Sequence, residues 1–186
     1  GKYLLPEDSL GRSVPWGLVK GNGGSRKTII LTGHYDVVDT EEYGNERALA
    51  YDVEKWENLG KSGNVLPGMP DEVKEDFLSG DWMFGRGTAD MKGGLSVGLV
   101  LLDWYGKIVA EAEGKASSVA VSEAEVASEL GDASGISGNL LFVTVPDEEG
   151  YSAGMRGAVP FLNEVKERFD LEYTALIDLE PASMEN

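Results

Sequence analysis

The chain has 186 residues, of which 41% are hydrophobic and 26% charged, as in an ordinary globular domain with its own core. Its 33 acidic and 16 basic residues leave a net charge of −17 without any basic stripe, which argues against a nucleic-acid partner. Cysteine is absent, which excludes disulfides and thiolate zinc sites, and no apolar run approaches the roughly 20 residues that span a membrane. We therefore expect a cytoplasmic protein without a membrane partner.

The first third of the chain predicts two strands and an acidic excursion. Residues 1–13 are expected to be irregular, and residues 14–20 form a short strand before a glycine-rich turn. Residues 27–32 are a β-branched apolar run of the length of a buried strand. Residues 39–81 are acidic and interrupted by prolines, which indicates a surface excursion from the sheet. Within it we expect short helices at 53–59 and 71–78.

A glycine-rich stretch, 85–94, then leads into a helix at 95–105 that is apolar nearly all round and is expected to be buried. Residues 106–138 are rich in Ala, Ser, Glu and Gly, and we interpret them as a variable insertion. It contains either one exposed helix, at 122–130, or disorder. The remaining predicted elements are a buried strand at 139–145, an amphipathic helix at 153–169 and a third apolar strand at 173–179. In that last helix Met155, Val159, Phe161, Leu162, Val165 and Phe169 lie on or near one face.

Continuous apolar strands that alternate with helices are typical of an α/β fold with a mostly parallel sheet and helices on both faces. In such sheets ligands bind beyond the carboxyl ends of the strands. Potential metal ligands follow three of the predicted strands, and the glycine-rich stretch adds a fourth segment. These residues are His34 and Asp36, then Asp147, Glu148 and Glu149, then Asp178 and Glu180, with Asp90 from the glycine-rich stretch.

So many carboxylates at one edge would repel one another unless cations lie between them. Imidazole with carboxylates suits zinc, with manganese and cobalt as alternatives, and a pair of metals bridged by carboxylate is a known hydrolytic arrangement. Each residue also has an ordinary explanation taken alone. Asp90 could be a solvated side chain in a turn, and Glu148 and Glu149 could be an exposed helix start.

Three segments in order resemble the signatures of the M20 family of zinc peptidases and deacylases: 33–39 (GHYDVVD), 85–94 (GRGTADMKGG) and 147–150 (DEEG). The likeness runs from about residue 27 to residue 181. It implies a three-layer α/β sandwich like that of the zinc exopeptidases. The excursion with its ending at 80–87, and the segment 177–181, are most similar to the arginine-utilisation branch of this family.

The resemblance implies a role for each site residue and two zinc ions in a complete site. His34 and Glu180 would bind the first zinc, with Asp178 as the alternative to Glu180. Asp90 would bridge the two ions, and Glu149 would bind the second. Asp36 would hydrogen-bond the other nitrogen of His34, and Glu148 would be the general base. The family also has a cis peptide after the bridging aspartate, here between Asp90 and Met91.

The implied activity is hydrolysis of an amide or peptide bond by a zinc-activated water, with a small-molecule amide or short peptide as substrate. Family members are about twice as long, with a lid domain and a further histidine, whereas His34 is the only histidine here. We therefore expect residues 1–186 to be an incomplete catalytic domain that is inactive alone. Apolar surface left open by the missing part would favour association with another copy or with the missing half. The alternative is a non-catalytic α/β binding or regulatory module that retains the fold.

Overall fold

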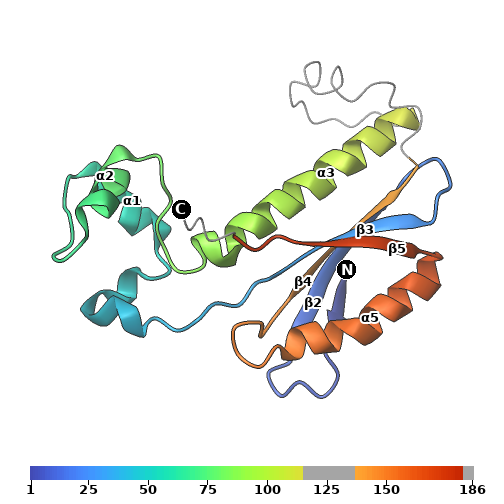
Figure 1. Ribbon diagram of the computed structural model, residues 1–186, viewed down its shortest axis with the longest axis horizontal. Helices are drawn as coiled ribbons and strands as arrows, with labels where there is room; N and C mark the ends of the chain where they lie inside the picture. The colour runs from blue at the N-terminus through green and yellow to red at the C-terminus, as the bar shows by residue number, and fades with distance from the viewer. Residues whose placement is uncertain (115–136, 182–186) are drawn as a thin grey trace.

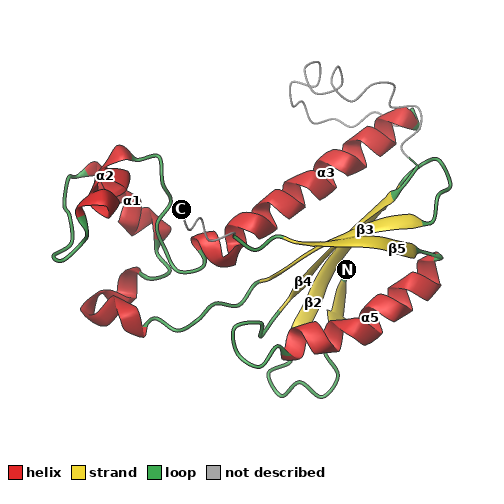
Figure 2. Cartoon of the chain, viewed as in Figure 1, coloured by secondary structure: helices red, strands yellow, loops and turns green. Residues whose placement is uncertain are grey.

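The computed structural model describes residues 1–114 and 137–181, and it confirms the α/β fold. Its centre is a mixed five-stranded sheet in the order β1-β2-β4-β3-β5 (Figures 1 and 2). The strands are β1 (Lys2–Leu4), β2 (Ser13–Lys20), β3 (Lys27–His34), β4 (Asn139–Val145) and β5 (Glu172–Asp178). The helical segments are η1 (Glu41–Leu49), α1 (Val53–Lys61), α2 (Asp71–Ser79), η2 (Thr88–Gly93), α3 (Gly94–Ala112) and α5 (Ala153–Phe169).

The sheet is parallel in one half and antiparallel in the other. Strands β4, β3 and β5 run parallel, as their continuous apolar sequences predicted. Strand β2 pairs antiparallel with β4, and β1 pairs antiparallel with β2. The expectation that residues 1–13 are irregular was wrong, because β1 lies there. A strand of three residues is too short to show a period of two in the sequence.

The core has two layers, one on each face of the sheet. Because successive strand residues point to opposite faces, Ile30 packs on the side of α5 and Leu31 packs on the side of α3. In β4, Leu141 likewise packs on the side of α5, and Phe142 packs on the side of α3. Figure 1 shows α3 and α5 on opposite sides of the sheet. This two-sided burial explains why β3 and β4 are continuously apolar.

Helix α5 begins and ends at the predicted residues, 153–169. Phe161 and Val165 are buried against the sheet, whereas Met155 and Val159 lie on the exposed side of the helix. The predicted apolar face was therefore too wide. The expected helix at 122–130 lies outside the described residues.

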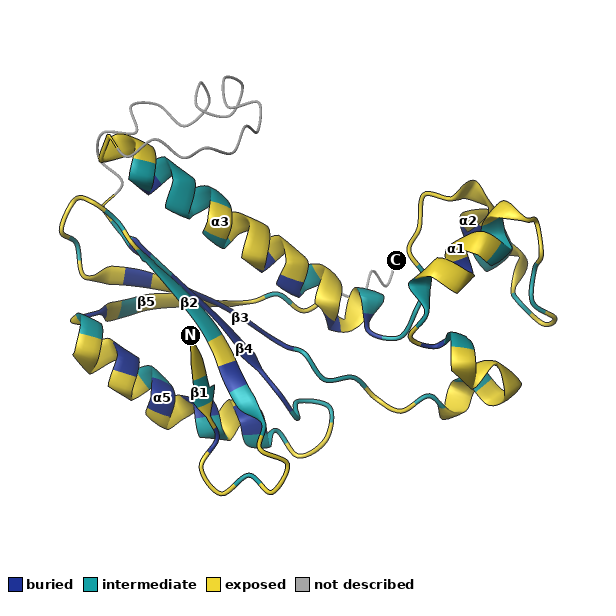
Figure 3. Ribbon diagram, turned by 180° about the vertical axis from the view of Figure 1, so that it is seen from behind, coloured by how far each residue is buried: buried dark blue, intermediate teal, exposed yellow. Residues whose placement is uncertain are grey.

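Helix α3 differs from its prediction in length and in burial. It continues to Ala112, through residues that we had assigned to an insertion. The expectation that it is buried was wrong, because only one side rests on the sheet. Figure 3 shows the exposed positions along this helix. The exposed apolar side chains are Val97, Leu99, Val100 and Leu101.

The helical segment Thr88–Ala112 is long and apolar enough, by length and composition, to cross a membrane. It is not an uninterrupted apolar run, because it contains Asp90, Lys92, Asp103, Lys107 and Glu111. A core helix of a soluble protein meets the same criterion, so the segment does not indicate a membrane span.

The excursion after β3 places η1, α1 and α2 away from the sheet (Figure 1). The helices α1 and α2 lie where the sequence predicted them. Trp56 of α1 packs against Phe77 of α2 and against Phe84, with ring centroids 5.8 and 6.2 Å apart. This aromatic cluster stabilises the excursion without contribution from the core of the sheet.

Candidate metal centre

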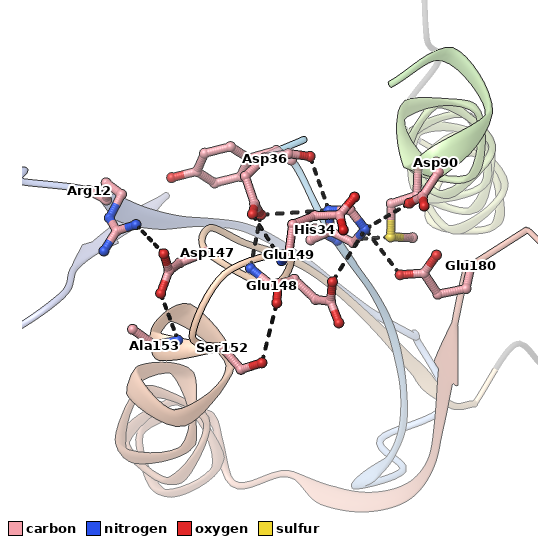
Figure 4. A network of polar contacts seen from close by, with 12 residues as sticks. Arg12, His34, Asp36, Asp90, Asp147, Glu148, Glu149, Ser152, Ala153 and Glu180 are labelled. Atoms are coloured by element: carbon pink, nitrogen blue, oxygen red, sulfur yellow. Dashed lines mark hydrogen bonds and ion pairs between the residues drawn. The ribbon is translucent and has the colours of Figure 1, made fainter. Parts of the chain in front are cut away.

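His34, the last residue of β3, is the centre of the candidate site (Figure 4). Its side chain is 1% exposed. Its Nε2 atom lies 3.0 Å from Oδ1 of Asp90 and 3.1 Å from Oε1 of Glu180. A single Nε2–H can donate to one of these oxygens well but not to both. Two carboxylate oxygens therefore face one nitrogen of His34 that can donate a good hydrogen bond to only one of them.

Asp90 reaches His34 from the glycine-rich stretch that leads into α3. Gly87 has φ +79°, a conformation that glycine adopts without strain, and it turns the chain just before η2. The peptide bond between Asp90 and Met91 is cis, as the resemblance implied. Met91 is fully buried beneath the site, and its Sδ accepts a hydrogen bond from the His34 N–H at 3.0 Å. The stretch thus connects the Asp90 carboxylate firmly to the end of β3.

Glu180 follows the end of β5, next to the first turn of α3. A Cβ atom at Gly94 would lie 2.0 Å from the carbonyl oxygen of Leu179, so only glycine permits this approach of backbone to backbone. Leu179 also packs into the core layer beneath α3. The glycine therefore allows Glu180 and Asp90 to reach the same nitrogen of His34.

Asp36 orients two neighbouring segments. Its backbone carbonyl lies 3.1 Å from Nδ1 of His34, while its carboxylate Oδ1 is 3.6 Å from that atom. The carboxylate accepts the backbone N–H groups of Glu148 and Glu149, both at 3.1 Å. The resemblance implied a hydrogen bond between Asp36 and the imidazole, and the backbone carbonyl rather than the carboxylate lies at that distance. It did not imply the two hydrogen bonds to the turn after β4. Backbone amides give no signal in a sequence pattern.

The structure brings five of the predicted ligands and bases together in two overlapping groups. His34, Asp90 and Glu149 offer ligand atoms within 4.8 Å of one another, and so do His34, Glu148 and Glu180. Asp178, the alternative to Glu180, belongs to neither group among the described residues. One buried imidazole with several convergent carboxylates is a donor set that fits a divalent cation such as zinc.

The electrostatics of the site follow from this crowding. Burial by itself would lower the pKa of His34, but the Asp36 carbonyl and the nearby carboxylates outweigh it and raise the pKa. Burial and then the charge of Asp90 raise the pKa of the Glu149 carboxyl. Burial also raises the pKa of the Glu180 carboxyl, partly offset by His34. A bound cation would relieve the repulsion among these carboxylates.

Arg12 and Asp8, which the sequence did not single out, adjoin the site through Asp147. The Nη1 atom of Arg12 donates to Oδ1 of Asp147 at 2.9 Å. The Arg12 guanidinium holds the pKa of the Asp147 and Asp8 carboxyls below the ordinary value. A cavity of about 370 Å³ lies beside this pair and is lined in part by Asp36 and Glu149. Arg12 was missed because its segment carries no motif and was expected to be irregular.

Two bacterial proteins are similar to nearly the whole chain. This chain is 37% identical over 178 residues to the uncharacterized protein YqjN of Bacillus subtilis (strain 168). The matched region covers 96% of this chain and 27% of YqjN. The chain is 30% identical over 177 residues to the protein RocB of the same organism, covering 95% of this chain and 26% of that protein. No protein-family model matches the chain. The chain therefore spans about a quarter of the length of these curated relatives.

Proposed function

We propose that this chain carries part of the catalytic site of a zinc-dependent amidohydrolase, a peptidase or N-deacylase like those of the M20 family. The observation that carries the proposal is the convergence of Asp90 and Glu180 on Nε2 of His34, at 3.0 and 3.1 Å. These residues come from three separate segments of the chain. A surface cluster of acidic residues would not need a buried imidazole at its centre.

In this proposal His34, Asp90 and Glu180 hold one zinc ion, and Asp90 and Glu149 contribute to a second. Bound zinc supplies Lewis acidity toward a carbonyl oxygen and lowers the pKa of water. Glu148 lies next to this group, with a carboxylate oxygen 3.9 Å from Nε2 of His34, and serves as the base that accepts a proton. Asp36 holds Glu148 and Glu149 in position through their backbone N–H groups.

The substrate proposed is a small amide or a short peptide. The resemblance of the excursion and of the segment 177–181 to the arginine-utilisation branch favours a role in arginine use. The bacterial relatives and the absence of cysteine favour a cytoplasmic location.

Isothermal titration of the metal-free protein with zinc tests the metal site. We expect tight binding by the unchanged protein, and loss of that binding in the double variant His34→Ala, Asp90→Ala. Equal affinity in both proteins would disprove the proposal. The variant Asp103→Asn, which removes an exposed carboxylate that pairs with Lys107 on α3, is a matched control and should bind zinc normally.

The role of Glu148 is tested by Glu148→Gln in the full-length protein, assayed for amide hydrolysis. The isosteric amide cannot accept the proton, so we expect a loss of several orders of magnitude in kcat with zinc still bound. Unchanged amidase activity would instead favour the alternative, a non-catalytic binding module. The single histidine of the chain is the observation that keeps this alternative open.

A further inference from the structure

We propose that Arg12, through its ion pair with Asp147, is a positioning residue for the turn that carries Glu148 and Glu149. This inference rests on the proposed function, because its consequence is the placement of a zinc ligand and of the base. Nothing in the motifs of the chain assigns a role to Arg12. The argument depends on three sets of contacts around the turn.

The guanidinium of Arg12 is held in one orientation. Its Nε and Nη2 atoms donate to Oδ1 of Asp8 at 3.1 and 2.7 Å, while Nη1 donates to Asp147 at 2.9 Å. Side-chain exposure is 26% for Arg12 and only 9 and 16% for the two carboxylates. A planar guanidinium bound on two edges is a rigid support, unlike a single mobile ion pair on the surface.

Asp147 transmits this support to the start of the turn. Its backbone has φ +63°, a left-handed conformation that aspartate tolerates better than most residues. Its Oδ1 accepts from Arg12, and its Oδ2 accepts from the N–H of Ala153, the first residue of α5, at 3.0 Å. One carboxylate therefore connects the β1–β2 loop, the turn and the helix that follows it (Figure 4).

The two residues after Asp147 are held by Asp36, whose carboxylate accepts both of their backbone N–H groups. The turn is thus held at Asp147 by Arg12 and at Glu148 and Glu149 by Asp36. Metal ligands must be held within about 0.5 Å of their productive position. Loss of Arg12 would leave Asp147 without its cation and allow the turn, including Glu149, to shift.

Zinc titration of the metal-free protein tests this role with a matched arginine control. We expect Arg12→Ala to weaken zinc binding about tenfold, the lower end of the effect of outer partners of metal ligands. Arg26→Ala removes another arginine–aspartate ion pair, an exposed one with Asp170 at 2.8 Å, just before the end of β3 that lies opposite His34. That control should leave zinc affinity within about twofold of the unchanged protein.

A second pair of variants separates positioning from general stability. Asp147→Asn keeps an acceptor for Ala153 and tolerates the left-handed backbone, so it should fold and weaken zinc binding in the same direction as Arg12→Ala. In a Glu149→Ala background, Arg12→Ala should have no further effect, because the ligand that it positions is gone. The Arg12 variant would show the same tenfold loss in that background if it acted only by destabilising the fold.

The outcomes distinguish this inference from the proposed function. If the unchanged protein binds zinc no better than His34→Ala, Asp90→Ala, the proposed function fails. If the unchanged protein binds zinc but Arg12→Ala and Asp147→Asn both match the Arg26→Ala control, only the positioning role is overturned. A tenfold loss that persists without Glu149 also overturns it.

Discussion

Asp36 shows how one residue can serve two parts of the candidate site, one with its backbone and the other with its side chain. Its carbonyl faces Nδ1 of His34, and its carboxylate accepts the N–H groups of Glu148 and Glu149. It therefore joins the end of β3 to the turn after β4. The charge of a carboxylate is well matched to two backbone donors that converge on it.

We predict that Asp36→Ala weakens zinc binding by about 10- to 100-fold, because the turn loses the acceptor of two N–H groups and His34 loses the carboxylate 3.6 Å from its Nδ1. Isothermal titration measures this effect. Asp36→Asn should lose less, since its amide oxygen still accepts one of the two N–H groups. Equal affinities of the unchanged protein and of Asp36→Ala would contradict the role.

Asp8 makes a prediction about pH. The hydrogen bonds from Arg12 hold the pKa of the Asp8 carboxyl below its ordinary value, so the folded state binds this proton less readily than the unfolded state. The ionised Asp8 carboxylate therefore adds to the free energy of unfolding at pH values above its unfolded pKa. This stabilisation is lost as the pH falls through the lower pKa of the folded state. Asp8→Asn should therefore be less stable than the unchanged protein near pH 7, and the difference should shrink in strong acid. Urea unfolding near pH 7 and in strong acid measures the difference in stability between the two proteins. A difference that is the same at both pH values would contradict the prediction.

At the scale of elements, the approach of α3 to the end of β5 determines whether the site forms. Gly94 lies where a side chain would collide with the Leu179 carbonyl oxygen. Gly106, on the same helix, has room, because a Cβ there would meet the nearest side chain, Val19, at 3.5 Å. The packing therefore requires glycine at position 94, whereas position 106 has room for a side chain.

We predict that Gly94→Ala lowers the free energy of unfolding by about 1–3 kcal/mol, since the helix start must move away from the sheet. It should also weaken zinc binding, because Glu180 follows Leu179 directly. Gly106→Ala is the control, and it should leave stability unchanged or raise it by up to about 1 kcal/mol through helix propensity. Urea unfolding of both variants checks the prediction, which fails if Gly94→Ala behaves like the control.

At the scale of the whole molecule, apolar side chains remain open on both faces of the sheet near β5. In the described part of the chain β5 pairs with β3 alone, which leaves one edge of β5 unpaired. Leu176 and Ile177 of this strand are 54 and 46% exposed, and Val100 of α3 is 67% exposed. An unpaired strand edge with apolar faces favours association.

We predict that residues 1–186 associate with one another at micromolar concentration, and more strongly at high salt, where the net charge of −17 is screened. Sedimentation velocity measures the association. The variant Val100→Lys, Ile177→Lys should shift the protein toward monomer, whereas Leu78→Lys, at an exposed position on α2, should not. A monomer at all salt concentrations would disprove the prediction.

Much of the fold could be predicted because apolar runs and helical periodicity in the sequence indicate where its strands and helices lie. Strand β4 and helix α5 begin and end at the expected residues, and β3 and β5 differ from the expected bounds by one or two. Apolar runs and helical periodicity are properties of neighbouring residues, which the sequence displays directly. The three-residue β1 and the exposure of α3 depend on which other segments pack nearby, so periodicity could not reveal them.

The sequence by itself determined which types of side chain the candidate site offers and that His34 and Glu180 follow strands, with Asp90 in the glycine-rich stretch. Only the tertiary structure decided that these side chains meet at one imidazole nitrogen, and that Arg12 and Asp147 support the turn beside them. Arg12 lies 135 residues from Asp147 in the chain. A contact over that separation arises from the packing of the β1–β2 loop against the start of α5, and no local pattern contains it.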